Sequence, residues 1–384
     1  MMHAPLSAAF RVEWCEAAAL GGIVDEWRAL VKQALEPNVF YDPAFMLAAA
    51  PVLGKAVRVA LVRTNAGRLV GMFPTRIERP RGSPSSMLVG WTHPYAPLGT
   101  PLIDREGSAG IIAAWLDHLG RDRTLPRLLL MPLLPEQSAF EAALDSVLAH
   151  SGRRHAVFGR HRRAMLNPGA QRADYIARVV SAGRRKELRR QRRRLDDIAP
   201  VTLTTARSGA DVAAALQDFL ALEAAGWKGR GGTAIAADPA IEEFVRTAVT
   251  ALATTGGARV DRMLHGDRAI AAAVTLASAD SAWCWKIAYD ETFARASPGV
   301  QLICELTDSL LAEPEPIRVD SCAVADHPMI DHLWRERLTL SDRIIALRPS
   351  PVPFALTCRA ERLRRRVLAA LKTARDRLRG GAAA

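Results

Sequence analysis

The sequence predicts an α/β protein whose mixed, mostly antiparallel sheets are flanked by helices. The chain has 384 residues, which is more than one ordinary compact core holds, so two domains or one unusually large domain are expected. Hydrophobic residues make up 49% and charged residues 24%, the balance of a globular protein. Strand-like and helix-like segments also follow the same order in each half: a strand, two helices, a hairpin, and then alternating strands and helices.

The first half contains clear start and turn signals for these elements. Asp42 is a plausible N-cap, because it precedes Pro43 at the first helical position. The polar residues 65–68 separate two strand-like runs and predict a hairpin. The predicted elements are strands at 11–15, 57–64, 69–77, 87–91, 127–131 and 154–158, and helices at 23–35, 43–50, 108–119 and 136–150.

The second half repeats this order and adds a basic tail. A boundary is expected within 159–171, which gives domains at 1–165 and 166–350 and a basic C-terminal helix and tail at 351–384. Leu363, Val367 and Leu371 fall near one face of that last helix. The predicted elements are helices at 181–195, 210–225, 239–254, 299–311, 327–335 and 360–378, and strands at 201–205, 258–264, 269–277, 281–289, 317–322 and 340–347.

Charge and cysteine usage limit the classes of partner and compartment. The formal net charge is +12, which attracts anions such as phosphorylated cofactors, nucleic acid or an acidic membrane surface. The five cysteines never form a C-x-x-C spacing, so neither a disulfide framework nor a metal site is expected. We see no secretory signal and no membrane span, and we expect the protein in the cytoplasm, with the periphery of the inner membrane as the alternative.

The segment after the strand at 281–289 is the most informative for function. Ser297 is a plausible N-cap, Pro298 suits the first helical position, and Gly299 lets an anion approach the backbone. A helix start with free amides and a positive dipole end is a ready phosphate site, and Arg295 adds a nearby cation. An ordinary capped helix would carry the same residues.

Several motifs together resemble the GNAT acyltransferase superfamily, in the branch of CelD-like proteins associated with cellulose biosynthesis, which is related to FemAB-type aminoacyl transferases. The resemblance covers about 181–348 and implies tandem GNAT-like lobes and acyl transfer to a cell-envelope or exopolysaccharide precursor. The segments 36–40 and 90–95 also look similar to this branch. The matching residues of the main region are Arg189, Arg190, 192–195, 219–223, 226–234, Trp285, Lys286, 288–291, 297–299, Asp320 and Trp334.

The resemblance implies a donor site for an acyl-CoA, such as acetyl-CoA, in the second half. The usual superfamily loop has a denser glycine pattern, whereas this chain has only Gly299. That departure keeps aminoacyl-tRNA, the donor of FemAB-type relatives, open as the alternative. The implied donor residues are Lys286, Ile287 and Ala288, whose backbone amides would face the oxyanion, and Arg295, Ser297, Gly299, Val300 and Gln301 at the diphosphate.

Direct acyl transfer needs a base, oxyanion donors and an acid. Asp320, at the end of a predicted strand, is the first candidate for the base or for orienting the acceptor, with Tyr289 or His327 as the acid. Each has a structural alternative as a turn cap or core residue. The candidate acceptor-binding residues are Trp227, Lys228 and Arg230 in a glycine-rich segment, and His93 and Tyr95 in a loop of the first half.

A dense basic helix lies between Arg184 and Arg194. It is expected to contact RNA phosphates, an acidic glycan or an anionic membrane, or to be a solvated face. No RNA-binding motif or neighbouring aromatic accompanies it, so sequence-specific readout of nucleic acid is not expected. Three hypotheses stay open: an acyl-CoA-dependent transferase, a FemAB-like aminoacyl transferase, and a non-catalytic module that binds a polysaccharide-synthesis partner or the membrane.

Overall fold

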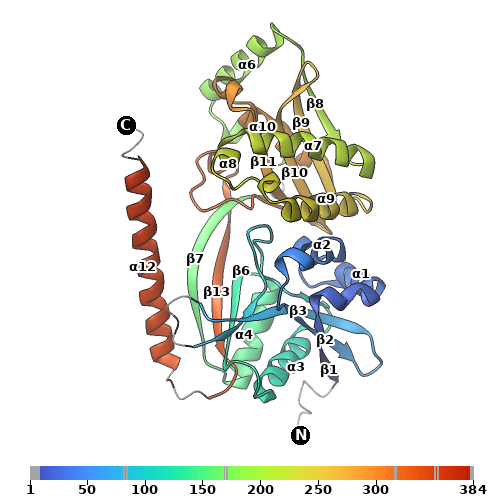
Figure 1. Ribbon diagram of the computed structural model, residues 1–384, viewed down its shortest axis with the longest axis vertical. Helices are drawn as coiled ribbons and strands as arrows, with labels where there is room; N and C mark the ends of the chain where they lie inside the picture. The colour runs from blue at the N-terminus through green and yellow to red at the C-terminus, as the bar shows by residue number, and fades with distance from the viewer. Residues whose placement is uncertain are drawn as a thin grey trace.

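The computed structural model describes residues 9–80, 83, 85–167, 169, 172–314, 318–349, 352 and 354–380, with side chains described as far as Leu371. Two halves lie one above the other, and a long basic helix runs beside them (Figure 1). The predicted class is confirmed: the sheets are mixed and mostly antiparallel, and helices cover their faces.

In its described residues, the N-terminal half holds six strands and four α-helices. Asp42 caps the second helix as predicted, since its side chain accepts from the Ala44 amide at 2.8 Å. The elements are β1 (Phe10–Glu16), η1 (Ala17–Ile23), α1 (Val24–Gln33), η2 (Val39–Tyr41), α2 (Pro43–Leu53), β2 (Arg58–Thr64), β3 (Leu69–Glu78), β4 (Met87–Gly90), β5 (Leu102–Ile103), α3 (Ser108–Arg121), β6 (Leu128–Pro135) and α4 (Ala139–Ser151).

The C-terminal half repeats this plan, and three further elements join or flank the halves. The connecting strands are β7 (His155–Leu166) and β13 (Glu336–Ala346), and the flanking helix is α12 (Phe354–Gly380). The elements of the C-terminal half are α5 (Tyr175–Val179), α6 (Ala182–Asp196), β8 (Val201–Ala206), α7 (Gly209–Ala225), α8 (Trp227–Arg230), η3 (Ile235–Ala237), α9 (Pro239–Ala253), β9 (Ala258–His265), β10 (Arg268–Ser278), β11 (Ser281–Tyr289), η4 (Glu291–Ala296), α10 (Pro298–Ala312), β12 (Arg318–Asp320) and α11 (Ile330–Leu333).

One sheet path runs through both halves in the order β1-β2-β3-β4-β6-β13-β7-β12-β11-β10-β9-β8, and β5 pairs with β3 off this path. Each half is an antiparallel meander that ends in one parallel pair, β4 with β6 and β11 with β12. The last strand of each half lies against the other half, because β13 pairs with β6 and β7 pairs with β12. The two strands also pair with each other between the halves (Figure 1).

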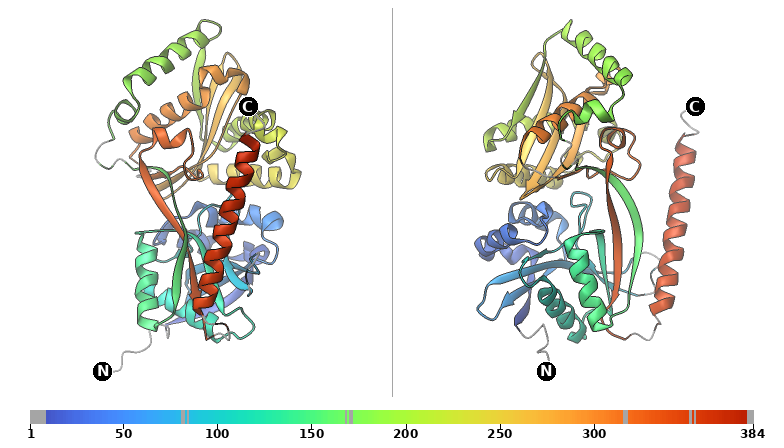
Figure 2. Two further views of the ribbon diagram at one scale, coloured as in Figure 1. Left: turned by 90° about the vertical axis from the view of Figure 1, so that its left-hand side faces the viewer. Right: turned by 180° about the vertical axis from the view of Figure 1, so that it is seen from behind.

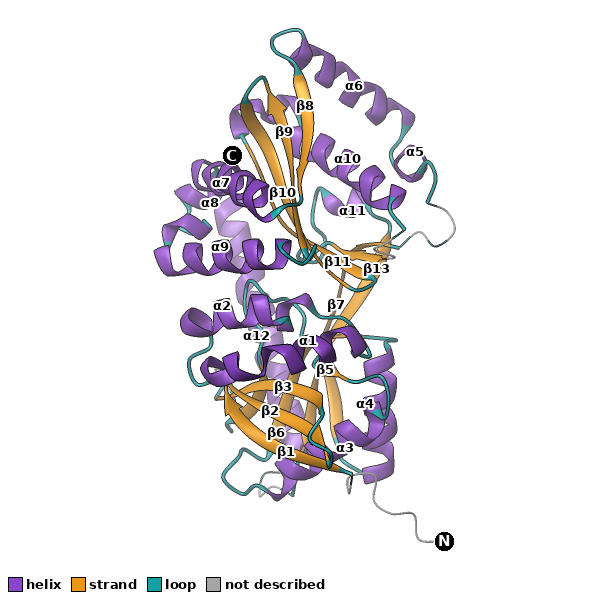
Figure 3. Cartoon of the chain, turned by 90° about the vertical axis from the view of Figure 1, so that its right-hand side faces the viewer, coloured by secondary structure: helices purple, strands orange, loops and turns teal. Residues whose placement is uncertain are grey.

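Both faces of the C-terminal sheet are covered by apolar layers, and the side chains of β10 alternate between these two layers. Ala272, Val274 and Leu276 pack into the cluster that contains α7 and α9. Ala271 and Ala273 point the other way, into the cluster that contains α10. Side chains that alternate between two apolar layers are the expected pattern of a central strand. Helices lie on both faces of this sheet (Figure 3).

The two halves share one hydrophobic core at their junction. Phe45 of α2 packs edge-on against Phe244 of α9, with ring centroids 5.3 Å apart. Phe45 and Phe40 also contact Trp285 and Trp283 of β11 at 5.8 Å each. The N-terminal half therefore supports β11 directly, the strand on which the site below is built.

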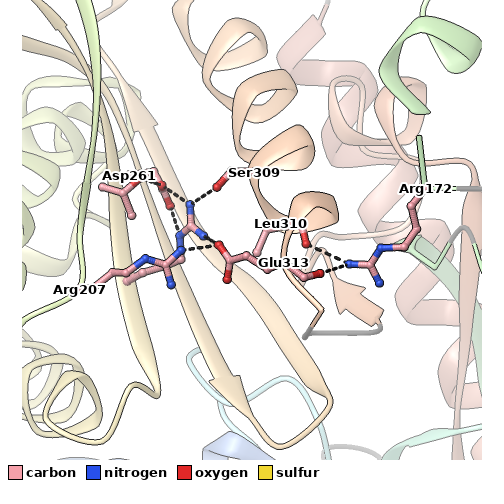
Figure 4. Close-up of polar contacts among 8 residues, drawn as sticks. Arg172, Arg207, Asp261, Ser309, Leu310 and Glu313 are labelled. Atoms are coloured by element: carbon pink, nitrogen blue, oxygen red, sulfur yellow. Dashed lines mark hydrogen bonds and ion pairs between the residues drawn. The ribbon is translucent and has the colours of Figure 1, made fainter. Parts of the chain in front are cut away.

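A buried ion network fixes the C-terminal end of α10 (Figure 4). The guanidinium of Arg259 on β9 binds Asp261 and Glu313, the latter at 2.9 Å, and donates to Ser309 Oγ at 3.1 Å. Arg172 adds bonds to the carbonyls of Leu310, Leu311 and Glu313. Because this end is held to β9, the opposite end of α10 keeps a fixed place over the sheet.

The structure corrects two predicted elements. The helix expected at 327–335 is only the short turn α11, because the chain leaves helical conformation at Trp334 and enters β13 at Glu336. The strand expected at 154–158 continues as β7 to Leu166, since its pairing with β13 and β12 extends through the predicted linker. The strand expected at 317–322 is β12, and residue 317 lies outside the described residues. The domain division at 165 stays a prediction.

Candidate functional site

The parallel strands β11 and β12 diverge, and a cavity lies where they separate. Only Ser281–Trp283 of β11 pairs with Arg318–Asp320 of β12. Beyond that point β11 runs on to Tyr289 while bonded only on its other edge, to β10. The opening is a cavity of about 600 Å³, lined by β11 from Cys284 onward, the start of α10, the end of α7 with α8, and the chain that follows β12.

The first turn of α10 forms one wall of this cavity. Pro298 stands at the first helical position as predicted. The predicted capping by Ser297 is wrong: this residue is left-handed (φ 52°), and its side chain makes no capping hydrogen bond in the described chain, since its Oγ accepts instead from Arg184 at 3.4 Å. The first-turn amides of Gly299 and Val300 therefore have no side-chain cap from Ser297, and they stand at the positive end of the helix.

Gly299 is in close contact with β11. A Cβ placed there would stand 3.3 Å from the ring of Tyr289 and 3.8 Å from Ile287. A large side chain at this position would have to enter the cavity or displace Tyr289.

A β-bulge in β11 determines what faces the other side of the cavity. Val274 pairs with Lys286 and Thr275 with Cys284, so Trp285 is the extra residue. Because of the bulge, Trp285 and Lys286 both point toward the N-terminal half. There Trp285 Nε1 donates to the Tyr95 carbonyl at 2.8 Å. Lys286 Nζ lies over the Tyr95 ring, 4.8 Å from its centroid.

Lys286 is a partly buried amine on the cavity wall. The pKa of Lys286 is lowered to about 8, chiefly by burial and also by the nearby Lys228, while Glu223 acts in the opposite direction. Cation–π contacts with Tyr95 and Trp285 favour the charged form but do not outweigh burial. An appreciable fraction of this amine is therefore neutral near pH 7 to 8, which suits it to accept a proton.

Glu223 and Lys228 form an ion pair beside Lys286. Lys228 Nζ is 2.6 Å from Glu223 Oε1, and Glu223 Oε2 accepts from the Ile235 amide at 2.8 Å. Glu223 is only 4% exposed, so its charge is partnered on both oxygens. The pair fixes the start of α8 against α7 and supplies the field that acts on Lys286.

The short helix α8 lies over the cavity, and Glu291 of η4 holds it in place. Glu291 accepts from the Trp227 amide at 2.7 Å and binds Arg230 at 2.5 Å. A Cβ at Gly229 would stand 1.7 Å from the Ala224 carbonyl oxygen, so only glycine fits there. Trp227 lines the cavity but is 62% exposed, at the edge where an acceptor would enter.

Asp320 lies apart from the lining of this cavity. Its carboxylate binds the buried Arg163, and its Oδ1 accepts from the Cys322 amide at 2.9 Å. Arg163 also donates to the Pro97 carbonyl at 3.1 Å. Asp320 thus anchors the end of β12 to β7 and to the N-terminal half.

His327 and Tyr289 do line the cavity. His327 Nδ1 accepts from the amides of Met329 and Ile330 at 3.3 and 3.4 Å, and burial lowers its pKa. The neutral ring then carries its proton on Nε2, which makes it a donor and not a base. Tyr289 is 37% exposed at the rim, next to Gly299.

Besides Asp320 and Tyr95, four predicted site residues do not line the cavity. His93 lies inside the aromatic cluster of the junction, where burial, then Arg76 and Lys286, lower its pKa to about 3. Gln301 donates to the Ala296 carbonyl at 2.7 Å and closes the turn before α10. Arg295 is exposed on η4, and Arg230 pairs with Glu291. Tyr95, by contrast, reaches the cavity wall through its contact with Lys286.

The structure brings together most predicted residues and adds others that the sequence did not single out. Ile287, Ala288, Val300, Trp227 and Lys228 all line the cavity. Glu223 and Glu291 fall in the matching segments 219–223 and 288–291 but were not predicted as site residues, because their roles depend on contacts that the sequence does not show. Among the described residues, no group of three or more His, Cys, Asp or Glu side chains is placed to hold a metal ion.

Comparisons with known proteins agree with this geometry. Residues 182–322, from the start of α6 to just beyond β12, match the family model of the acetyltransferase (GNAT) domain. The match covers less than half of the chain and indicates a GNAT-like domain of the transferase class in this region. A search of curated proteins found no match in sequence.

Solved structures with the same fold cover most of the chain. FemX is 10% identical, with a TM-score of 0.57 over 84% of this chain and 95% of its own. A C-terminal domain from Agrobacterium fabrum, described as part of a lysylphosphatidylglycerol synthetase, is 9% identical, with a TM-score of 0.54 over 84% and 92%. A conserved protein of unknown function from Bacteroides thetaiotaomicron is 10% identical, with a TM-score of 0.52 over 84% and 96%. At these identities the likeness shows the fold alone.

Proposed function

We propose that this chain is an acyltransferase that takes its acyl group from an acyl-CoA such as acetyl-CoA. One observation carries the proposal: the cavity between the diverging strands β11 and β12 has the start of α10 as a wall. The first-turn amides at Gly299 and Val300 suit a diphosphate, and the free edge of β11 suits a thioester carbonyl. The match of 182–322 to the GNAT domain supports this donor.

The catalytic proposal follows from the two sides of the cavity. The donor lies on the side of α10, Ile287 and Tyr289, and the acceptor enters on the side of α8 and Trp227. The neutral amine of Lys286 removes a proton from the amine or hydroxyl of the acceptor. At the same time, that nitrogen or oxygen of the acceptor bonds to the acyl carbon. The carbon–sulfur bond then breaks, and the thiolate takes a proton from the Lys286 ammonium. Tyr289 or His327 Nε2 would supply a further donor at the leaving group.

The acceptor class rests on the resemblance to CelD-like proteins, and we propose a cell-envelope or exopolysaccharide precursor with a free amine or hydroxyl. The exposed ring of Trp227 beside Lys228 supports a sugar acceptor, because aromatic faces stack on sugar rings and a cation orients polar substituents. Asp320 would act here by anchoring the end of β12.

A second candidate is an aminoacyl transferase that uses aminoacyl-tRNA. The contact between Arg184 of α6 and Ser297 favours it, because this contact places the basic helix beside the cavity mouth. A salt-sensitive tRNA interaction along Arg184, Arg189 and Arg193 would follow. Binding calorimetry with acetyl-CoA and with aminoacyl-tRNA separates the two. Binding of acetyl-CoA without tRNA supports the first proposal, and the reverse result supports the second.

Gly299→Trp is expected to abolish acetyl-CoA binding while the protein stays folded. The new side chain starts 3.3 Å from the Tyr289 ring and must occupy the cavity at the proposed diphosphate site. Calorimetry measures the effect, and circular dichroism checks the fold. The matched control is Gly21→Trp, since a Cβ at Gly21 has nothing within 4 Å. If Gly299→Trp binds acetyl-CoA with unchanged affinity, the donor does not bind at this wall of the cavity.

A further inference from the structure

The C-terminal helix α12 packs against the body along one side only. Cys358 and Glu361 are 5% and 4% exposed, and Arg365 binds Asp342 of β13 at 2.8 Å. Arg362 and Arg365 also lie over the ring of Phe158 on β7. These contacts attach the first part of α12, and the helix then continues beside the body (Figure 2).

The opposite side of α12 carries an apolar stripe that faces solvent. Leu363 and Leu371 are 64% and 61% exposed, and Leu356 and Val367 are 49% each. Their spacings of seven, four and four residues place them on one helical face. Cys358, Glu361 and Arg365 fall on the other face, so burial against the body does not account for the stripe.

Positive charge flanks this stripe. Arg359, Arg362 and Arg366 are exposed and lie to one side of it by helical position. The only acidic residue within 354–371 is Glu361, and it is buried in ion pairs with Arg364 and Arg365. The accessible face of this segment is therefore apolar in the middle and basic along its flank.

We propose that α12 docks this protein on an anionic membrane surface. A helix with an exposed apolar stripe and flanking arginines lies in the plane of the interface, with its apolar side chains among the acyl chains and its cations at anionic headgroups. A second copy of this chain is a poorer occupant, because pairing two such faces would bring their arginines together. The described helices include none that is long and apolar enough to cross a bilayer, so α12 lies on the surface.

Vesicle sedimentation of the full chain tests this proposal. We expect binding to vesicles made of equal parts phosphatidylcholine and phosphatidylglycerol, and little binding to phosphatidylcholine alone. Added salt should weaken the binding, because screening acts on the arginine contribution. Leu363→Ser should reduce affinity for the mixed vesicles by about tenfold, since one large apolar side chain no longer enters the interface.

The matched control is Ile77→Ser, which removes a 54%-exposed apolar side chain from β3 and should leave vesicle binding unchanged. Analytical ultracentrifugation of the same samples reports self-association. A dimer that dissociates in Leu363→Ser, without vesicle binding, would overturn the proposal in favour of a second copy. Binding that persists in Leu363→Ser but is lost in Arg189→Gln with Arg193→Gln would overturn it in favour of α6.

Discussion

Lys286→Met is expected to lower kcat by about 10²- to 10⁴-fold, because it removes the group that we propose as the general base. Methionine has a similar shape and buries no charge, so the fold should survive. The affinity for acetyl-CoA should change little, since the proposed donor contacts are backbone amides. Release of the CoA thiol with an amino-sugar acceptor measures kcat, and calorimetry measures donor affinity.

The dependence of the rate on pH provides a second readout. Because Lys286 must be neutral to accept a proton and its pKa is about 8, kcat/KM should rise with pH and level off above about 8. Lys286→Met should lose this rise. The exposed Lys32→Met is the matched control and should keep both rate and profile. Full activity in Lys286→Met would exclude this amine from the reaction.

Arg163→Met is expected to destabilise the protein by about 3–5 kcal/mol. Arg163 is 2% exposed and Asp320 is 6% exposed, so the substitution leaves a buried carboxylate without its cation. The free energy of unfolding in urea, followed by tryptophan fluorescence, measures the loss. The double variant Arg163→Met with Asp320→Leu should recover much of it, because no unpaired charge remains.

The exposed pair of Arg28 and Asp25 supplies the control for this experiment. Their nitrogen and oxygen are 3.6 Å apart and both side chains are more than half exposed, so Arg28→Met should cost less than about 1 kcal/mol. A loss in Arg163→Met that is no larger than the loss in Arg28→Met would contradict the anchoring role of Asp320.

The sequence predicts most of the local elements, because capping and periodicity act over a few residues. Asp42 before Pro43 and the strand predicted at 269–277 both correspond to elements of the structure. The exchange of β7 and β13 between the halves was not predictable in this way. It depends on pairing of Met165 with both Asp320 and Glu336, contacts between segments more than 150 residues apart.

The candidate site was likewise predictable only where its features depend on residues close together in the sequence. The helix start at Pro298 and the cavity-lining Lys286, Ile287 and Ala288 follow from a strand, a loop and a helix beginning at proline that are adjacent in sequence. The role of Lys286 as an amine with a lowered pKa could not be predicted, because it requires the bulge at Trp285 and the distant ring of Tyr95. The position of Asp320 depends in the same way on Arg163.

A crystal structure with acetyl-CoA tests the central claim most directly. The account predicts the diphosphate at the amides of Gly299 and Val300, and the thioester carbonyl at the free edge of β11 with its carbon facing Lys286 Nζ. The account would be contradicted by a CoA molecule bound along α6 or elsewhere, with Tyr289 and Ile287 still in contact with Gly299.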